Sequence, residues 1–164
     1  MAANLEVTDA QLTKFYICDT GVDLGDATKI KTALTSAKRI AYLEDLGDFT
    51  KTRETTEYKC IDEDAVAVSQ GAVSYGETEL KLFYKAGQDN GVNELSEMFD
   101  KKQRKQFIIV GDDEPATGAT KHPTYITGEF INTKAGITIN KGDVIRVPAV
   151  IKITRLDKII PASA

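Results

Sequence analysis

Runs in which apolar and polar residues alternate recur along most of the chain, and they predict short β-strands. The clearest run places three apolar side chains on one face: Leu80, Leu82 and Tyr84. A longer run over 144–153 places five on one face: Ile145, Val147, Ala149, Ile151 and Ile153. Pro148 interrupts the longer run. Because proline lacks the N–H that a strand ladder uses, it predicts an edge strand or a bulge there.

One stretch between two predicted strands has helical spacing instead of alternation. Four apolar residues recur in it at intervals of three or four positions: Val92, Leu95, Met98 and Phe99. This spacing predicts a helix over about residues 92–104, with those four side chains packed on a β-sheet. A second apolar strand, 106–110, follows the helix. The scattered apolar residues of 22–31 predict a loop.

The stretch 50–56 is polar and has no hydrophobic face. Such a sequence is typical either of a long exposed hairpin or of a loop that becomes ordered only against a partner. Alternation resumes at 57–61. Two further short strands are predicted at 65–69 and 72–75, separated by Gln70–Gly71.

Together these runs predict a mainly β fold: an antiparallel β-sandwich or barrel of about seven to nine strands with one flanking α-helix. The length of 164 residues is enough for one hydrophobic core, and no repeat, low-complexity tract or linker divides the chain. Residues 1–164 are therefore expected to form a single domain. Residues 1–13 are mixed and polar, and they fit either a mobile N-terminal arm or a short edge strand.

The composition is that of an ordinary globular protein. The net charge of −4, from 21 basic and 25 acidic residues, argues against tight nucleic-acid binding, which usually needs a basic surplus. No apolar run approaches the roughly 18 residues of a membrane-spanning helix, and the N-terminus lacks the basic start and apolar core of a signal peptide. Cys18 and Cys60 are therefore expected to be reduced thiols.

Few residues suggest catalysis or ligand binding. The single histidine, His122, stands in a loop before a proline without a nucleophile motif, so it is interpreted as an exposed loop histidine. The acidic runs 62–64 and 112–114 lack the spacing of an EF-hand, and one histidine with two distant cysteines does not complete a usual zinc site. No phosphate-binding motif follows Gly21–Gly25. The sequence therefore predicts no catalytic residue, no cofactor and no metal.

The order of the elements resembles that of the tail tube (major tail) proteins of long-tailed bacteriophages. The resemblance covers most of residues 35–156. It rests on segments that follow one another in this order: Leu46-Gly47-Asp48, Thr55-Thr56, Gln70-Gly71-Ala72-Val73-Ser74-Tyr75-Gly76, the Leu80–Tyr84 strand, the helix with Leu95, the Phe107–Val110 strand, Thr127-Gly128-Glu129-Phe130, and the long strand after Gly142-Asp143-Val144.

The resemblance implies a β-sandwich with a flanking helix, and hexameric rings whose inner strands close into a continuous β-barrel. In that family the rings stack into a tube through which DNA and the tape-measure protein pass, and loops and terminal arms join the rings. The chain would then be a virion structural protein, made in the host cytoplasm and without a membrane anchor. Its partners would be other copies of itself, the tape-measure protein, the tail terminator and baseplate or tip proteins.

Two features of the sequence fit this role independently. A mildly acidic chain suits a channel along which DNA slides, because like charges lose the counterion release that drives binding. Ring closure would also remove exposed sheet edges, which are a liability in a monomer. The polar stretch without an intramolecular partner is assigned to contact between rings: Thr50, Lys51, Thr52, Arg53, Glu54, Thr55 and Thr56.

Other functions stay open at this point. A tail terminator and a secretion-system tube ring protein are related structural alternatives. A β-sandwich that binds a small ligand or carbohydrate would need clustered exposed aromatic residues, and the chain has no tryptophan and 7% aromatic residues in all. A hydrolase would rest on His122 alone.

Overall fold

The computed structural model describes residues 13–62, 64–85, 87, 91–111 and 123–161. Within them the chain forms ten strands and two helices. The strands are β1 (Lys14–Cys18), β2 (Lys38–Ile40), β3 (Leu43–Asp45), β4 (Lys51–Lys59), β5 (Val66–Tyr75), β6 (Glu77–Phe83), β7 (Arg104–Gly111), β8 (Thr124–Lys134), β9 (Arg146–Leu156) and β10 (Ile160–Pro161), and the helices are α1 (Ala27–Leu34) and α2 (Val92–Asp100). The pairings of these strands are antiparallel, so the predicted mainly β class is confirmed.

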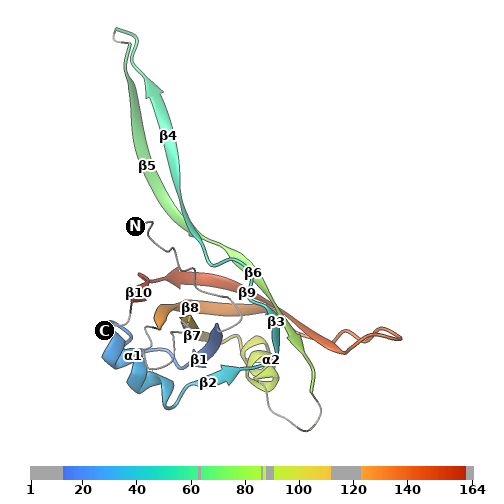
Figure 1. The fold of residues 1–164 in the computed structure, drawn as a ribbon. Helices are drawn as coiled ribbons and strands as arrows, with labels where there is room; N and C mark the ends of the chain where they lie inside the picture. Colours follow the sequence, from blue (N-terminus) through green and yellow to red (C-terminus); the bar gives the residue numbers. More distant parts are fainter. Residues whose placement is uncertain (1–12, 63, 86, 88–90, 112–122, 162–164) are drawn as a thin grey trace, which may run out of the picture.

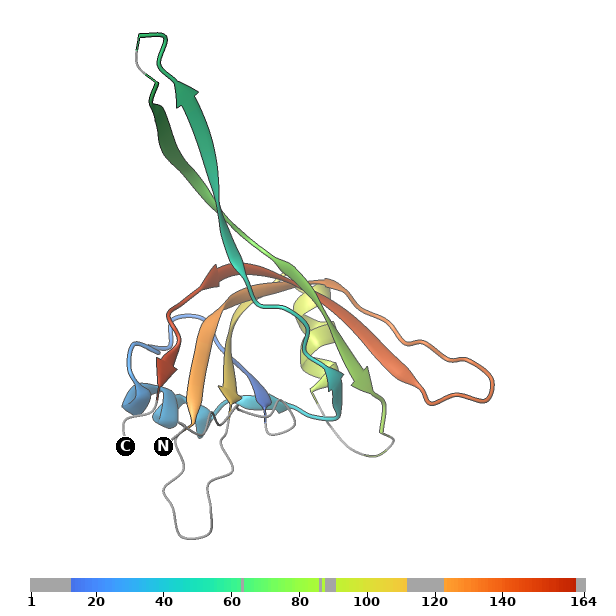
Figure 2. The ribbon, with the colours of Figure 1, turned by 45° about the horizontal axis from the view of Figure 1, so that its top comes forward.

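The main sheet curls into a half-barrel. Its strands follow the order β2-β1-β7-β8-β9-β6-β3, and β10 pairs with β8 beside this path. Although β2 and β3 stand at opposite ends of the path, only Ala41 and Tyr42 separate them in the chain. Tyr42 makes this corner with a φ of 59°, and its carbonyl accepts a hydrogen bond from Phe83 N at 2.9 Å. The chain therefore joins the two ends of the sheet at this corner without pairing them, and Figure 2 shows the sheet as an arch.

The concave face of the half-barrel holds the main core. Phe15, Phe107 and Phe130 are fully buried there, and the ring centroids of each pair lie 5.9 to 6.0 Å apart. The predicted apolar face of β9 is buried at every position from Val147 to Ile153, and Leu80 and Leu82 of β6 are buried beside it. Tyr84, which alternation placed on that same face, lies beyond the end of β6 and is exposed.

Helix α1 corrects the prediction of a loop at 22–31. Asp26 caps it, because its carboxylate accepts a hydrogen bond from Lys29 N at 2.8 Å. Ile30 and Ala33 are buried against the convex face of the sheet, in a second core cluster with Ile108 and Tyr125. The fold therefore has a second helix, one more than the sequence predicted.

Helix α2 lies where a helix was predicted, but it ends at Asp100 and β7 begins at Arg104, so the predicted extent of 92–104 is too long. Leu95 and Met98 are buried in the main core, and Val92 is partly buried against it. Phe99, predicted to pack beside them, is 43% exposed because it falls on the outer side of the last turn.

A buried amide joins α2 to the sheet. Asn132 Nδ2 of β8 donates to the carbonyl of Leu95 at 2.8 Å. Lys105 of β7 reaches Glu94 of the same helix, with its Nζ 3.3 Å from Oε2. The helix is thus held on the concave face by apolar burial, one buried hydrogen bond and one partly buried ion pair.

Pro148 does not make β9 an edge strand, because β9 lies between β8 and β6. The pairing with β8 begins only at Val150, so no residue of β8 is paired with Pro148. The proline is tolerated because it stands where only β6 accompanies the strand, opposite Lys81.

A long hairpin, β4–β5, projects from the half-barrel and dominates the outline of the molecule (Figure 1). The β8–β9 connection forms a second, shorter projection (Figure 2). Neither of the two described helices is long and apolar enough to cross a membrane. Of the predicted N-terminal arm, only Thr13 belongs to the described residues; the expectation for 1–12 lies outside them, and the single-domain expectation for the whole chain stays a prediction.

Candidate assembly interface

The projecting hairpin contains the residues that the sequence assigned to contact between rings. Thr50 comes directly before β4, and the other six, Lys51 to Thr56, form its first two thirds. All seven are exposed. Of the two interpretations of this polar stretch, the exposed hairpin is the one found, and its role in contacts between rings stays a proposal.

The partner strand β5 is one continuous strand, which corrects the prediction of two strands split at Gln70–Gly71. The register shifts between the pairs Arg53–Val73 and Thr55–Gln70, so β5 carries a bulge instead of a turn. A Cβ at position 71 would make only ordinary contacts with Glu54, at 3.4 Å, so the bulge does not require glycine for lack of space. Arg53 Nη1 donates to the carbonyl of Gly71 at 2.9 Å and stabilises the bulge.

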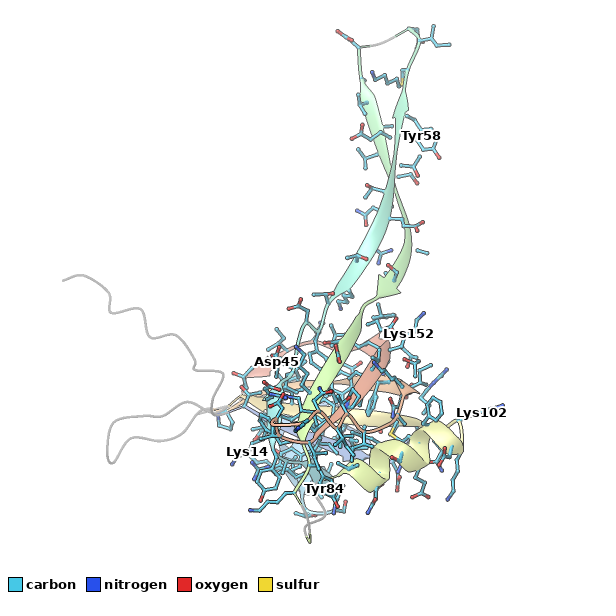
Figure 3. The ribbon with its side chains drawn as sticks, turned by 90° about the vertical axis from the view of Figure 1, so that its right-hand side faces the viewer. Lys14, Asp45, Tyr58, Tyr84, Lys102 and Lys152 are labelled. Atoms are coloured by element: carbon cyan, nitrogen blue, oxygen red, sulfur yellow. The ribbon has the colours of Figure 1, made fainter. Side chains whose placement is uncertain are left out.

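The two faces of the hairpin differ in chemistry. The first, the aliphatic face, combines valines with long polar or charged side chains: Lys51, Arg53, Thr55, Glu57, Lys59, Val66, Val68, Gln70, Val73 and Tyr75. The second, the hydroxyl face, is mainly small and hydroxyl-bearing: Thr52, Glu54, Thr56, Tyr58, Ala67, Ser69 and Ser74. On the hydroxyl face, Thr52 and Ser74 are cross-strand partners with their oxygens 2.8 Å apart. Figure 3 shows side chains leaving the ribbon on both sides along its length, with Tyr58 in the outer part.

The base of the hairpin is anchored in the body of the protein. Tyr75 and Phe49 pack against the main core, and Phe49 lies with its ring centroid 5.4 Å from that of Phe107. Gly76 N donates to the carbonyl of Thr50 at 3.1 Å, and Ile153 N donates to the carbonyl of Gly76 at the same distance. The hairpin is therefore fixed at its base, and its described residues beyond the base are exposed to solvent.

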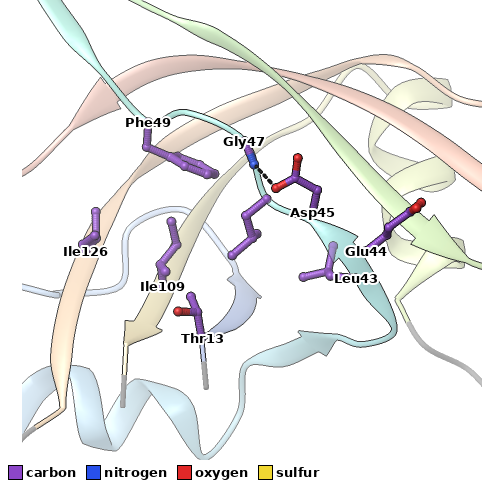
Figure 4. Close-up of a pocket in the computed structure, with 9 residues that line it drawn as sticks. Thr13, Leu43, Glu44, Asp45, Gly47, Phe49, Ile109 and Ile126 are labelled. Atoms are coloured by element: carbon purple, nitrogen blue, oxygen red, sulfur yellow. Dashed lines mark hydrogen bonds between the residues drawn. The ribbon is translucent and has the colours of Figure 1, made fainter. Parts of the chain in front are cut away.

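A hollow of 710 Å³ opens into the concave side of the half-barrel, below the base of the hairpin. Its walls are mostly apolar, and Phe49, Ile109 and Ile126 come from three different segments (Figure 4). Glu44 and Asp45 stand at its edge, where Asp45 Oδ1 accepts from Gly47 N at 3.2 Å. Among the described residues that line it, no nucleophile and base stand together, so the hollow is a surface recess of the half-barrel.

The second projection also exposes apolar side chains. Ile137, Ile139 and Val144 are each more than half exposed on the β8–β9 connection. Its base is fixed by Arg146, which lies 3.1 Å from Glu44 and 2.6 Å from Asp143. Hydrogen bonding from Val144 N and from Arg146 lowers the pKa of the Asp143 carboxyl. The described part of the molecule thus offers two exposed projections and a recess.

No metal-binding group of histidine, cysteine or acidic side chains occurs in the part of the chain that the structure describes. His122 and the acidic run 112–114 lie outside that part, as does Glu63 of the run 62–64. Cys18 is buried, and burial with the neighbouring Asp19 charge raises its pKa to about 11, so its thiol is unreactive. Cys60 is exposed near the tip of the hairpin.

Solved structures with the same fold belong to phage tails and phage-like particles. No protein-family model and no curated protein sequence matches the chain. A chain in the sheath and tube terminator of an extracellular contractile injection system is 11% identical, with a TM-score of 0.63, over 99% of this chain and 100% of that one. A chain in the tail of a gene transfer agent particle, refined with sixfold symmetry, is 11% identical with a TM-score of 0.61, over 96% and 100%. A chain in the SPP1 phage tail tube is 10% identical with a TM-score of 0.54, over 96% and 80%.

These likenesses confirm the fold that the resemblance implied, that of tail tube and tube terminator proteins. Sequence reasoning predicted strands at 65–69 and 72–75 but missed that they form one strand, β5, which pairs with β4. The alternation of Val66, Val68 and the later Val73 was visible, but the bulge at Gly71 shifts the phase and was interpreted as a break between strands.

Proposed function

We propose that the chain is a structural subunit of a long-tailed bacteriophage tail tube. Six copies would form a ring, and the rings would stack around a channel for DNA. The subunit would have no catalytic role and would belong to the virion after synthesis in the host cytoplasm. The fold that it shares with tail tube chains, and the sixfold symmetry of the gene transfer agent tail, support this proposal.

The observation that carries the proposal is the bare hairpin. Its strands pair with each other, β4 is exposed throughout, and Val66 and Val68 are 52% and 60% exposed. A two-stranded hairpin in water is marginally stable at best. Both outer edges also leave backbone hydrogen-bonding groups unpaired, which favours pairing with another chain. A hairpin of this length is therefore best explained as an element that neighbouring copies cover, at the ring contacts assigned to residues 50–56.

The charge of the chain supports passage of DNA through the assembly. With 25 acidic and 21 basic residues, the subunit has no overall basic excess that would retain DNA through counterion release. DNA and the tape-measure protein would then occupy the channel without sequence-specific binding, and terminator and baseplate or tip proteins would close the two ends of the tube.

A tube terminator is the second candidate, because terminator and cap chains share the fold over almost the whole chain. A terminator would form a single ring and stop. The two functions therefore differ in whether rings of this protein stack on one another.

Negative-stain electron microscopy of the purified protein over a range of concentrations tests the proposal. Hollow filaments with sixfold end views are expected. Single closed rings that never lengthen would favour the terminator, and a monomer at every concentration would count against both.

A shortened hairpin provides a sharper test. Residues 55–70 are replaced by Asn-Gly, a pair that forms tight hairpin turns. The described residues of the removed part are all exposed, so the thermal midpoint should change by only a few degrees, while filaments should be lost. Lys31→Ala on α1, away from the hairpin, is the control and should still form filaments. Normal filaments from the shortened protein would sink the assignment of the hairpin to assembly.

A further inference from the structure

We infer that the two faces of the hairpin have separate roles: the aliphatic face is buried against a second copy of this chain, and the hydroxyl face stays in the water of the channel. This inference rests on the proposed function. It states which face of the hairpin meets another copy and which face meets water. The register, the exposure and the charge of the hairpin carry it.

The strand register separates the two chemistries at every pair. Val68 stands opposite Glu57 and Val66 opposite Lys59, whereas the neighbouring pairs are Thr56 with Ser69 and Tyr58 with Ala67. Adjacent residues of a strand point to opposite faces, so next to each valine in the sequence a small residue points to the other face. Burial of one face would cover the valines and leave the hydroxyls and Ala67 in water.

The aliphatic face continues the apolar interior of its own subunit. At the base, Tyr75 packs against the main core, and Val73 is partly buried. Farther out along the same face, Val68 is 60% exposed and Val66 is 52% exposed, since the body of one subunit does not reach them. The body of one subunit therefore covers the aliphatic face only at the base of the hairpin. A second copy, in a stack or a ring, can cover the outer part.

Charge also distinguishes the two faces. The aliphatic face carries Lys51, Arg53 and Lys59 against a single acid, Glu57. The chain as a whole has an acidic excess, so the rest of each copy is more acidic than its total charge. A basic and apolar face therefore fits the surface of another copy. The hydroxyl face has no basic residue, and only Glu54 is charged, so it offers no cation to a passing phosphate backbone.

Cysteine reporters on adjacent residues test this assignment. In a Cys60→Ser background, Val68→Cys places a thiol on the aliphatic face and Ser69→Cys places one on the hydroxyl face. Cys18 contributes no signal, because it is buried with a pKa raised to about 11. Each protein is treated with a small maleimide, once as dissociated subunits and once as assembled tubes, and the labelling rate is followed by mass spectrometry.

Both reporters should react readily in dissociated subunits. In tubes, the labelling rate of the Val68→Cys thiol should fall by about tenfold or more, whereas the Ser69→Cys thiol should keep most of its labelling rate. Loss of tubes in Val68→Cys alone, with an unchanged thermal midpoint, also supports the inference. Equal protection of both thiols, or protection of Ser69→Cys alone, would overturn it and leave the proposed function standing, since tubes have formed. Failure of the parent protein to form tubes overturns the proposed function, and the inference with it.

Discussion

At some positions of this fold, the residue type is restricted because a neighbouring strand lies very close to the backbone. Gly128 in β8 pairs with Phe107, and the register of β8 against β9 shifts just after it, between Glu129 and Phe130. A Cβ at position 128 would meet the carbonyl of Arg155 and would lie 2.8 and 2.9 Å from two ring carbons of Phe107. The glycine therefore serves both a bulge and a close contact in the centre of the sheet.

Gly128→Ala should destabilise the subunit by about 3 kcal/mol, because both the backbone of β9 and the buried Phe107 ring must move. Urea unfolding followed by circular dichroism measures this. Gly111→Ala on β7 is the matched control, since the nearest described atom would be the carbonyl oxygen of Thr124 at 3.9 Å, and it should change stability by about 0.5 kcal/mol or less. Equal losses of stability in the two variants would contradict the close approach of Arg155 and Phe107 to position 128.

The two cysteines should differ sharply in reactivity. At pH 8, a thiol reagent should label Cys60 within minutes, while Cys18 should react only after unfolding, because its pKa of about 11 leaves almost no thiolate and its side chain is buried. Titration with a chromogenic disulfide reagent should therefore count one thiol in the native protein and two in denaturant. Cys60→Ser should remove the native signal, and a fast signal that persists in this variant would contradict the burial of Cys18.

At the scale of elements, burial separates the elements that stabilise the fold from those whose surfaces are free to contact other molecules. Helix α2 contributes Leu95 and Met98 to the core and receives the Asn132 amide at its Leu95 carbonyl, whereas Phe99 points outward. The hairpin shows the opposite balance, since it is anchored at its base and exposed beyond it. Changes in the helix should therefore affect folding, and changes in the hairpin should affect assembly.

Leu95→Ala should cost about 3 kcal/mol, the usual range for truncating a buried leucine. Phe99→Ala, one turn along the same helix, should cost about 1 kcal/mol, because much of its ring is already in water. Thermal or chemical unfolding of the two variants measures the difference. If Phe99→Ala proved the more damaging, the orientation of α2 would have to be revised.

At the scale of the whole molecule, the half-barrel is an incomplete structure. Its sheet has two ends that the chain joins at Tyr42, a recess lined by apolar side chains, and two projections with exposed valine and isoleucine. Proteins with the same fold occur in a tail tube and in a sheath and tube terminator. Under the proposed function, the single subunit is one part of a larger surface.

The assembled protein should not retain DNA. Gel mobility of a short duplex should be unchanged by tubes that contain about 10 µM subunit at physiological salt, within the range where non-specific basic proteins bind. The acidic excess of the chain is the physical reason. A retarded band that disappears as salt is raised would reveal a basic surface that the net charge conceals, and it would count against a non-retaining channel.

Local patterns in the sequence determined the β class, the buried faces of β6 and β9, and the inward stripe of α2, because alternation and helical spacing report directly which side of an element is apolar. The same kind of signal was present for α1, where Asp26 precedes Ala27, Ile30 and Ala33 at helical spacing. The predicted loop ended at residue 31, before Ala33 and Leu34 complete the apolar stripe. Only the tertiary structure decided that 50–56 pairs with 66–75 as a bare hairpin, that the chain joins the sheet ends at Tyr42, and that Phe99 faces water. Those facts depend on register, on a bulge and on where an element stops. These are set by contacts between residues far apart in the chain, which no local pattern contains.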